Sequence, residues 1–471
     1  MKRVLMVAAA MLYVGTVLAQ EIPTSKLMEA ALGKANVMMQ MSYDYTQEAS
    51  KQVPAQKYSF QAICLTKDGL FMTFGISQGM RSQEITNLKL TAPGENGKSY
   101  KAEFLWADRE TGLAFVRATE NGEFTPASFN SAATLKVGTR LFSVGIFEDD
   151  PAHGLYVAPG YVSGVFRWPG KVVLVSGGST VNEGAPILNE EGQFVGISVS
   201  QFLRHQVRTQ QGPQEMQLES KVMGHFVHPA SEFAHVIDYA IKNPTKKRQL
   251  SWIGVLNFDP VDEAGLVKVD VPAVIVGKLA KGGPAEQAGL KERDVVVKVD
   301  GKGLEKFSSP VLVRTAMALN LIRMPAGQKV TLTVRRGDKE FDVPVTVTPQ
   351  PQDESDVERY IVTQLGFMVR DRAESDAFVM PEEIAGVDGL LVLQVPKNGP
   401  ADKAGLQPGD MITQLNNERV SKVQTFKTML DKAMTDKPNA PVNVTIQREK
   451  AKPVTLAIYP PAPENKTPAA P

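Results

Sequence analysis

The segment GPAEQAGL at residues 283–290 returns as GPADKAGL at residues 399–406, 116 positions further along the chain. The similarity continues into DVV at 294–296 and DMI at 410–412. Self-similarity at one fixed offset indicates tandem structural units, and this offset predicts about 100 residues for each unit. The second half of the chain is therefore a duplicated domain.

Each copy of the repeat is surrounded by the same predicted elements. Runs rich in β-branched residues and Leu, typical of strands, come before and after each copy. They are AVIV at 273–276, VTLTV at 330–334, LLVL at 390–393 and VNVTI at 442–446. A helix is predicted between each copy and its later strand. The pattern predicts two α+β units, at residues 244–350 and 351–460.

A short glycine-containing segment lies upstream of each copy, WIGV at 252–255 and QLGF at 364–367. Together with the repeat, these segments resemble PDZ domains, partly open barrels of five or six strands, in the order of the permuted bacterial form. QLGF is similar to the Gly-Leu-Gly-Phe loop of that family. In such a loop, consecutive backbone N–H groups bind a C-terminal carboxylate, and the ligand adds to the sheet edge as a strand.

The resemblance implies eight peptide-binding residues, four in each loop. They are Trp252, Ile253, Gly254, Val255, Gln364, Leu365, Gly366 and Phe367. The two glycines would allow the backbone to turn, and the apolar residues would line the pockets. The alternative is that one copy is only structural. The first copy is the better candidate for that role, because Arg293 stands where the second copy has Gly409.

Within a predicted domain at 57–243, residues from about 57 to 200 carry a different pattern, in which short apolar segments alternate with Gly, Asp and Asn turns. Strands at this spacing over about 150 residues predict an all-β barrel or sandwich. Four further predictions concern the flanking and connecting segments. They are a helix at 24–40 with a linker to 56, an exposed loop at 204–218, a helix at 231–242, and a solvated linker at 246–248.

Four blocks of the first half share the outline of one protease family. They are KDGLFMT at 67–73, DRETGLA at 108–114, NEGAPILN at 182–189 and GQFVGI at 192–197. In this order they resemble the trypsin-like serine proteases of the HtrA/DegP type. The resemblance implies a mainly β protein, in which a trypsin-like double β-barrel is followed by two PDZ domains.

The catalytic residues of that family are replaced at all three matching positions. Carried across, the triad of His, Asp and Ser falls on Ile76, Gly112 and Glu183. Ile76 cannot accept a hydroxyl proton, and Gly112 has no carboxylate to orient a base. All five histidines lie at or after residue 153, so no shift of the alignment supplies the base. The sequence therefore predicts a pseudoprotease without catalytic residues.

Other sources of chemistry are weaker. Cys64, the single cysteine, lies in an apolar strand and is predicted to be a buried structural thiol. His225, His228 and His235 are of a metal-binding type, but the resemblance places them at a strand–helix junction and on a helix. Glu183 could act with a nearby acidic residue as an acid–base pair, although nothing fixes their spacing. We expect neither a metal nor a cofactor.

Composition limits the partners and the location. The 471 residues contain 52 Lys and Arg against 51 Asp and Glu, a balance that argues against nucleic-acid binding by bulk charge. Residues 1–19 combine a basic start with a short apolar run, which predicts a cleaved signal peptide with no transmembrane segment after it. The Pro-rich tail at 461–471 is predicted to be disordered.

These features favour a periplasmic or secreted pseudoprotease that binds C-termini or extended, unfolded segments of other proteins. It would act as a scaffold, a chaperone-like protein or a regulatory partner in protein quality control. Family resemblance also implies a homotrimer, with the 24–40 helix at its interface, or assembly with active HtrA relatives. The alternatives are an active serine endopeptidase with unconventional residues, and a purely structural envelope protein.

Overall fold

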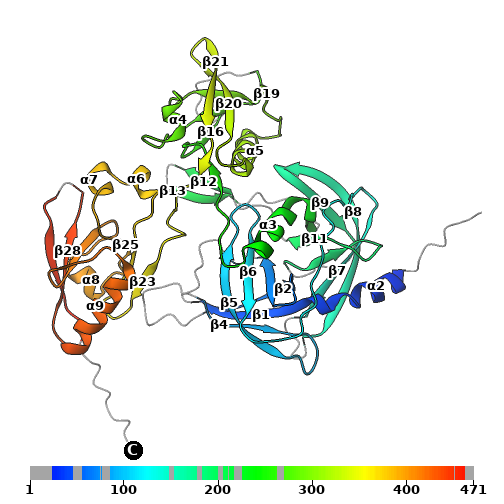
Figure 1. Ribbon diagram of the computed structural model, residues 1–471, viewed down its shortest axis with the longest axis horizontal. Coiled ribbons are helices and arrows are strands. Elements are labelled where there is room, and N and C mark those ends of the chain that lie inside the picture. Colours follow the sequence, from blue (N-terminus) through cyan, green and yellow to red (C-terminus); the bar gives the residue numbers. More distant parts are fainter. Residues whose placement is uncertain are drawn as a thin grey trace, which may run out of the picture.

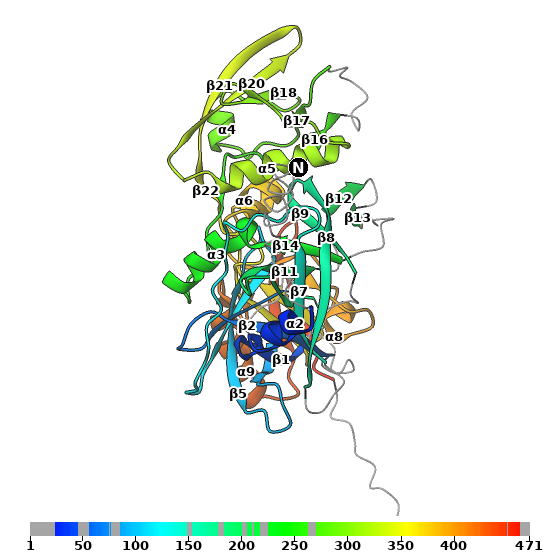
Figure 2. The same cartoon turned by 90° about the vertical axis from the view of Figure 1, so that its right-hand side faces the viewer.

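Figure 1 shows a computed structural model of the chain, in which two closed β-barrels are followed by two smaller units. One small unit lies above the barrels, and the other lies beside them (Figures 1 and 2). The structure describes residues 24–461 apart from ten short gaps. These are 46–55, 75, 77–84, 148–152, 178–182, 200–204, 210–211, 217–224, 262–269 and 450.

The first barrel closes in the order β1-β2-β3-β6-β5-β4. Its strands are β1 (Met38–Tyr45), β2 (Gln56–Cys64), β3 (Leu70–Phe74), β4 (Ile85–Thr91), β5 (Ser99–Ala107) and β6 (Leu113–Ala118). Side chains alternate between the two faces of each strand. In β1, Met41, Tyr43 and Tyr45 are buried, whereas Ser42 and Asp44 are partly exposed. Large apolar side chains therefore fill the interior of the barrel.

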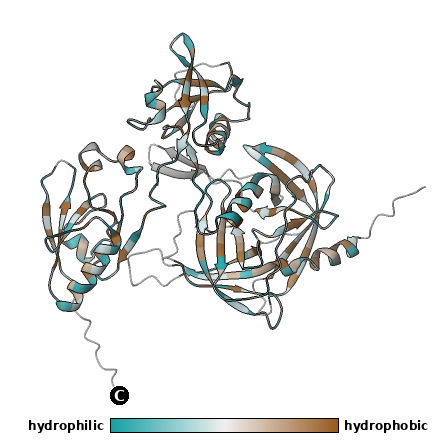
Figure 3. Cartoon of the chain, viewed as in Figure 1, coloured by the Kyte–Doolittle hydropathy of each residue, from teal (hydrophilic) through white to brown (hydrophobic). Residues whose placement is uncertain are grey.

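The second barrel closes in the order β10-β11-β14-β9-β8-β7. Its strands are β7 (Arg140–Ile146), β8 (Leu155–Trp168), β9 (Gly170–Ser176), β10 (Pro186–Leu188), β11 (Phe194–Val199) and β14 (His225–Pro229). The predicted helix at 231–242 is confirmed as α3 (Ala230–Lys242). Its buried face, with Phe233 and Val236, joins apolar residues of both barrels in one core. In Figure 3 the barrel strands change repeatedly between brown and teal along their length, as this packing requires.

The predicted helix at 24–40 is wrong beyond Leu32. α2 (Thr24–Leu32) is followed by a 3₁₀ turn, η1 (Ala35–Val37), and then by β1. Gly33 ends the helix, and the Val-Met-Met-Gln-Met run that follows pairs with β2 and β4. The first barrel therefore begins before the predicted boundary at residue 57. α2 packs against β7 and β8 of the second barrel. The side of α2 that contacts these strands is therefore covered by its own chain and not by another subunit.

The predicted loop at 204–218 contains a hairpin instead. β12 (His205–Thr209) and β13 (Gly212–Met216) pair in antiparallel register and form a separate two-stranded sheet. Polar composition alone suggested a loop. Backbone N–H and C=O groups of two adjacent segments can nevertheless pair as strands even when the segments are polar in sequence. The composition of this segment therefore did not predict its backbone structure.

The two repeat units each fold around one long helix, as the repeat predicts. In the first unit the sheet order is β16-β17-β18-β20-β21, β19 pairs with β18, and β15 pairs with β22. Its elements are β15 (Ser251–Trp252), β16 (Phe258–Pro260), β17 (Val274–Val276), α4 (Pro284–Gln287), β18 (Val295–Val299), β19 (Lys302–Gly303), α5 (Pro310–Arg323), β20 (Lys329–Arg336), β21 (Lys339–Thr346) and β22 (Thr348–Pro349).

The second unit has the sheet order β23-β24-β25-β26-β28-β29, with β27 beside β26. Its elements are β23 (Arg359–Val362), β24 (Phe367–Arg370), α6 (Asp376–Val379), α7 (Glu382–Ala385), β25 (Leu390–Gln394), α8 (Pro400–Lys403), β26 (Met411–Leu415), β27 (Glu418–Arg419), α9 (Val423–Asp436), β28 (Val442–Gln447) and β29 (Val454–Ile458). Its first strand is thus an edge strand of the main sheet, unlike β15 in the first unit.

Each unit contains the same ion pair, between a buried aspartate that follows the repeat and a partly exposed arginine. Asp294 is 1% exposed, and its two carboxylate oxygens accept hydrogen bonds from Arg336 at 2.6 and 2.7 Å. In the second unit, Asp410 is also 1% exposed and accepts from Arg448 at 2.6 and 2.7 Å. A bidentate pair of this kind holds the turn before β18 or β26 against the end of the neighbouring strand, β20 or β28. The repeated aspartate therefore has the same structural role in both units.

We expect Phe233→Ala to lower the free energy of unfolding of the double barrel by about 3–5 kcal/mol, because the substitution leaves a cavity in the shared core. Phe233 is 0% exposed. Ile241→Ala, on the same helix but 43% exposed, should change stability by less than about 0.5 kcal/mol. Urea denaturation followed by tryptophan fluorescence measures both. Equal effects of the two variants would contradict the assigned core.

Candidate functional site

The turns at two of the three triad positions, those of Gly112 and Glu183, meet at one side chain, Phe74, at the end of β3. A Cβ atom added to Gly112 would lie 3.1 Å from the Phe74 ring. A Cβ atom added to Gly184, the residue after Glu183, would lie 3.2 Å from Phe74 Cβ. Both glycines have positive φ, 73° and 81°. Phe74 therefore packs against the backbone of both turns, and the sequence analysis did not single it out.

The residues at the triad positions differ in their surroundings. Ile76 is 3% exposed and packs into the apolar interior of the first barrel. Gly112 offers no side chain, and Glu183 is partly buried in its turn. A serine protease needs a hydroxyl within hydrogen-bond reach of a base. Ile76 and Gly112 supply neither group, and Glu183 supplies a carboxylate but no hydroxyl.

The turn at 108–112 is held in shape by its own aspartate. Asp108 Oδ1 accepts hydrogen bonds from the backbone N–H groups of Glu110 and Thr111, at 3.1 and 2.9 Å. It also accepts from Thr111 Oγ1 at 2.9 Å. The Gly112 N–H donates to the Asp108 carbonyl oxygen at 3.0 Å. The network fixes the turn and leaves Asp108 Oδ2 and the Glu110 carboxylate to contact residues outside the barrels.

The Glu110 carboxylate is the centre of a charged cluster that joins the barrels to the first repeat unit. Its side chain is 0% exposed. It accepts a hydrogen bond from Arg248 at 2.6 Å and another from Arg323, the last residue of α5. His235 Nε2 lies 3.3 Å from the same carboxylate, and Arg248 Nε donates to Asp108 at 2.8 Å. The sequence analysis identified none of these residues as a group.

The electrostatics of this cluster favour the ionised carboxylate. Burial alone would raise the pKa of Glu110. The hydrogen bond with His235 and the positive charges of Arg323 and Arg248 outweigh burial and lower that pKa from 4.5 to about 2. Glu110 therefore stays charged at neutral pH and binds both arginines.

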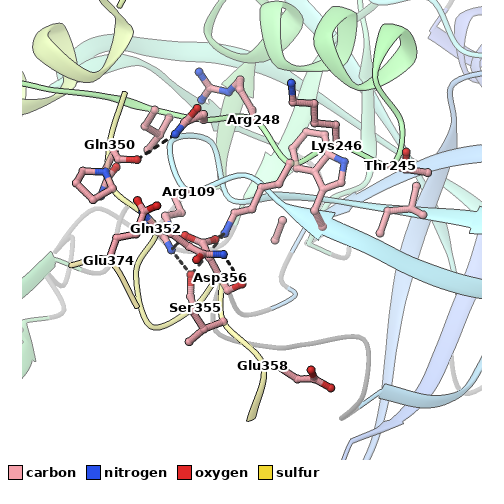
Figure 4. A pocket seen from close by; sticks show the side chains of 18 of the residues that line it. Arg109, Thr245, Lys246, Arg248, Gln350, Gln352, Ser355, Asp356, Glu358 and Glu374 are labelled. Atoms are coloured by element: carbon pink, nitrogen blue, oxygen red, sulfur yellow. Dashed lines mark hydrogen bonds and ion pairs between the residues drawn. The ribbon is translucent and has the colours of Figure 1, made fainter. Parts of the chain in front are cut away.

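A second group of ion pairs connects the turn at 108–112 and the linker after α3 to the linker between the repeat units. Arg109 pairs with Asp353, and Lys247 pairs with Asp356. Arg109, Lys247 and Asp356 line a cavity of about 680 Å³, together with residues of β5 and of both linkers. Figure 4 shows the side chains around this cavity. The prediction of a solvated linker at 246–248 is therefore wrong for Lys247 and Arg248. The facing acidic segment, DESD at 353–356, is the sequence signal that could have indicated the contact.

The remaining candidates for chemistry are enclosed. Cys64 is 1% exposed, as predicted, and burial raises the pKa of its thiol to about 12, which leaves little reactive thiolate. Burial also lowers the pKa of His228 to about 4. Within the residues that the structure describes, no three His, Cys, Asp or Glu side chains form a group suited to a metal ion.

The predicted loop of the first repeat unit has the required backbone. Gly254 has φ of 86°, and a Cβ atom there would lie 2.9 Å from the backbone nitrogen that begins α4. Ile253 and Val255 are buried in the core of this unit. The backbone N–H groups of Ile253, Gly254 and Val255 have no acceptor within the described residues. Trp252 instead braces the loop, because its Nε1 donates to the Val255 carbonyl oxygen at 3.1 Å.

The predicted loop of the second repeat unit makes the same turn but uses its N–H groups internally. Gly366 has φ of 71°. The N–H groups of Leu365 and Gly366 donate to the carbonyl oxygen of Val362, at 3.2 and 2.8 Å. Leu365 and Phe367 are 0% exposed, and Gln364 is partly buried. The two loops are thus similar in shape and different in hydrogen bonding.

Two family models match the chain and correspond to the units described above. Residues 62–197 match the trypsin-like peptidase domain, and residues 253–347 and 363–458 both match the PDZ domain. The chain therefore combines a trypsin-like peptidase domain with two PDZ domains, the domain order of HtrA/DegP-type proteins, to which it is similar. Its two barrels form the trypsin-like domain, and its two repeat units are the PDZ domains, so the predicted resemblance and fold class are confirmed.

Relatives of this HtrA/DegP-like protein carry a consistent name. A probable periplasmic serine endoprotease DegP-like of Chlamydia trachomatis is 27% identical over 71% of this chain and 63% of its own length. Its counterpart in Hahella chejuensis is 29% identical over 70% of this chain and 67% of its own. The chain thus spans less than two thirds of the first of these relatives.

The solved structures support the fold. An HtrA-type protease with a decapeptide matches with a TM-score of 0.51 at 15% identity, covering 70% of this chain and 98% of its own. Within the described part of the HtrA/DegP-like chain, no helix combines the length and hydropathy needed to cross a membrane.

The Glu110 cluster predicts pH-dependent docking of the first PDZ domain. The pKa of Glu110 is about 2 in the folded protein, against an ordinary value of 4.5. Ionised Glu110 therefore stabilises docking fully above pH 4.5, and this contribution is lost as the pH falls towards 2. Glu110→Gln should weaken docking by about 2–4 kcal/mol at neutral pH, since two arginines lose their charged partner. Amide hydrogen exchange of α5 at several pH values measures this.

The control for the Glu110 experiment is Glu340→Gln, which removes a carboxylate from a surface ion pair with Arg335 in the same PDZ domain. This variant should leave exchange in α5 unchanged. If Glu110→Gln also left it unchanged at neutral pH, the cluster would not be what holds the domain.

Proposed function

We propose that this HtrA/DegP-like protein is a pseudoprotease that captures C-termini or extended segments of other proteins through its PDZ domains. In this role it serves protein quality control as a scaffold, a chaperone-like protein or a regulatory partner. It works outside the cytoplasm, in the periplasm or as a secreted protein. The names of its relatives, which are called periplasmic, and the predicted signal peptide at 1–19 support this location.

The observation that carries the loss of proteolysis is the packing of Phe74 between the turns of Gly112 and Glu183. An aspartate at position 112 would need positive φ and would lie against the Phe74 ring, so its carboxylate could not readily orient a base. Ile76 supplies no base either. Removal of a complete triad costs about 10⁶-fold in rate in a serine protease.

The capture activity is supported by the first PDZ domain. Three consecutive N–H groups at 253–255 have no acceptor within the described residues and lie at the end of the loop that leads to β16. β16 pairs with β17 on one side, and α5 packs next to it. An extended peptide can add to such an edge and place its carboxylate on the loop.

The catalytic part of the proposal is tested with casein and the purified mature chain. We expect hydrolysis at or below the rate of the buffer control. The matched variant is Glu183→Ala. Measurable hydrolysis that this variant abolished would refute the pseudoprotease and establish an endopeptidase with unconventional residues.

The binding part is tested by titrating a C-terminal peptide library against the full chain. Gly254→Ala should lower affinity at least tenfold, because a Cβ atom clashes with the start of α4 and distorts the carboxylate loop. The matched control is Gly289→Ala in the same domain, where φ is also positive, 91°, but no atom lies within 4 Å of the added Cβ. Absence of binding to any free C-terminus would refute capture.

A further inference from the structure

The two PDZ domains differ in what pairs with the strand that follows the carboxylate loop. In the first domain, the strand before the loop is β15, which pairs with β22, and β16 remains an edge strand of its sheet. In the second domain, the strand before the loop is β23, which pairs with β24 along its length. β23 therefore covers the edge of β24 on which a ligand would add.

The register of β23 is that of a bound peptide. It runs antiparallel to β24 and ends at the loop, with Val362 opposite Phe367 and Tyr360 opposite Val369. Val362 is 0% exposed and belongs to the same apolar cluster as Leu365, Phe367 and Leu430 of α9. A PDZ pocket takes the last side chain of its ligand in this way, and here the occupant is a valine of the chain itself.

The next inward side chain of β23 contacts the helix that forms the other wall of the groove. Tyr360 packs against the core of the domain, and Lys427 Nζ of α9 lies 5.6 Å from the centre of its ring. Burial and the negative charge of Asp431, also on α9, raise the pKa of Tyr360. β23 thus touches both β24 and α9, the two elements between which a peptide would lie.

The carboxylate loop also contacts β23 in the way that it would contact a bound peptide. The N–H groups of Leu365 and Gly366 donate to the carbonyl oxygen of Val362, the last residue of β23. A ligand carboxylate would place an oxygen on the same kind of N–H group. In the first domain, the matching N–H groups of Ile253 and Gly254 have no acceptor within the described residues.

We propose that β23 is an internal ligand that closes the groove of the second PDZ domain, so that only displacement of Arg359–Val362 opens it. The groove then accepts free C-termini of the same chemistry, with a terminal valine and an aromatic residue two positions before it. The inference deepens the proposed function and rests on it for the role of C-terminal capture. It assigns constitutive capture to the first domain and conditional capture to the second.

Tethering makes this closure strong. The short loop at 363–366 gives β23 an effective concentration on the order of millimolar or higher at its own groove. For an intrinsic Kd on the order of 10 µM, about 99% of the grooves are closed, and the apparent Kd for an external peptide rises roughly a hundredfold. External C-termini therefore bind the chain with native β23 only weakly, with an apparent Kd on the order of 1 mM.

The test uses the full chain with Gly254→Ala, so that the second PDZ domain reports alone. The probe is a fluorescein-labelled Glu-Arg-Tyr-Ile-Val peptide with a free carboxylate, and its C-terminal amide is the control. One variant, Tyr360→Ala with Val362→Ala, weakens β23. A second, Ile361→Cys with Met368→Cys, joins a cross-strand pair by a disulfide. Cys64 is buried and does not compete.

We expect the weakened variant to bind the acid peptide at least tenfold more tightly than the chain with native β23, and not to bind the amide. Oxidation of the disulfide variant should lower its affinity at least tenfold relative to the reduced form. Amide exchange of β25 and β26 verifies that the domain stays folded. Should the weakened variant unfold, the oxidised and reduced forms of the disulfide variant decide alone.

Two results would overturn the internal ligand. One is equal affinity for the peptide with native, weakened and oxidised β23. The other is a folded weakened variant that binds no peptide, together with no effect of oxidation. Both are independent of casein hydrolysis and of capture by the first domain, so this inference and the proposed function can fail separately.

Discussion

An ionised carboxylate that is shielded from water needs positively charged partners. The carboxylate of Glu110, on the outside of the first barrel, finds them in two arginines, and the arrangement of the domains depends on these contacts. Its two arginines come from positions 138 and 213 residues further along the chain. One lies in the linker after α3 and the other at the end of α5. Leaving either charge unmatched costs more than the pair itself contributes, so the contact specifies where the first PDZ domain sits.

The same turn shows how a catalytic scaffold is reused. In the family it resembles, this segment leads to the aspartate of the triad. Here Asp108, Arg109 and Glu110 are engaged in the shape of the turn and in contacts with both linkers. Phe74 packs on Gly112, where the catalytic carboxylate would begin. In this chain the turn serves as a joint between domains.

The sequence predicted those features of the fold that depend on a local pattern of residues. The repeat at 283–290 predicted the PDZ pair. It failed where the outcome depends on distant partners. The polarity of Lys247 looks the same in a solvated linker and in an ion pair with Asp356. Likewise, β23 pairs with the next strand along the chain, whereas β15 pairs with the last strand of its domain. The local sequence of the two strands does not reveal this difference.

That difference between β15 and β23 also affects the order in which the two domains fold. Trp252 pairs with Thr348 near the far end of the first PDZ domain, a contact that closes a long loop of chain. Val362 pairs with Phe367 in a local hairpin, which forms on the scale of microseconds. The edge of β24 is therefore covered early in folding, while the first PDZ domain completes its sheet only after its last strand has emerged. During refolding, one of the two sheet edges next to the carboxylate loops is thus covered from the start and cannot pair with another chain.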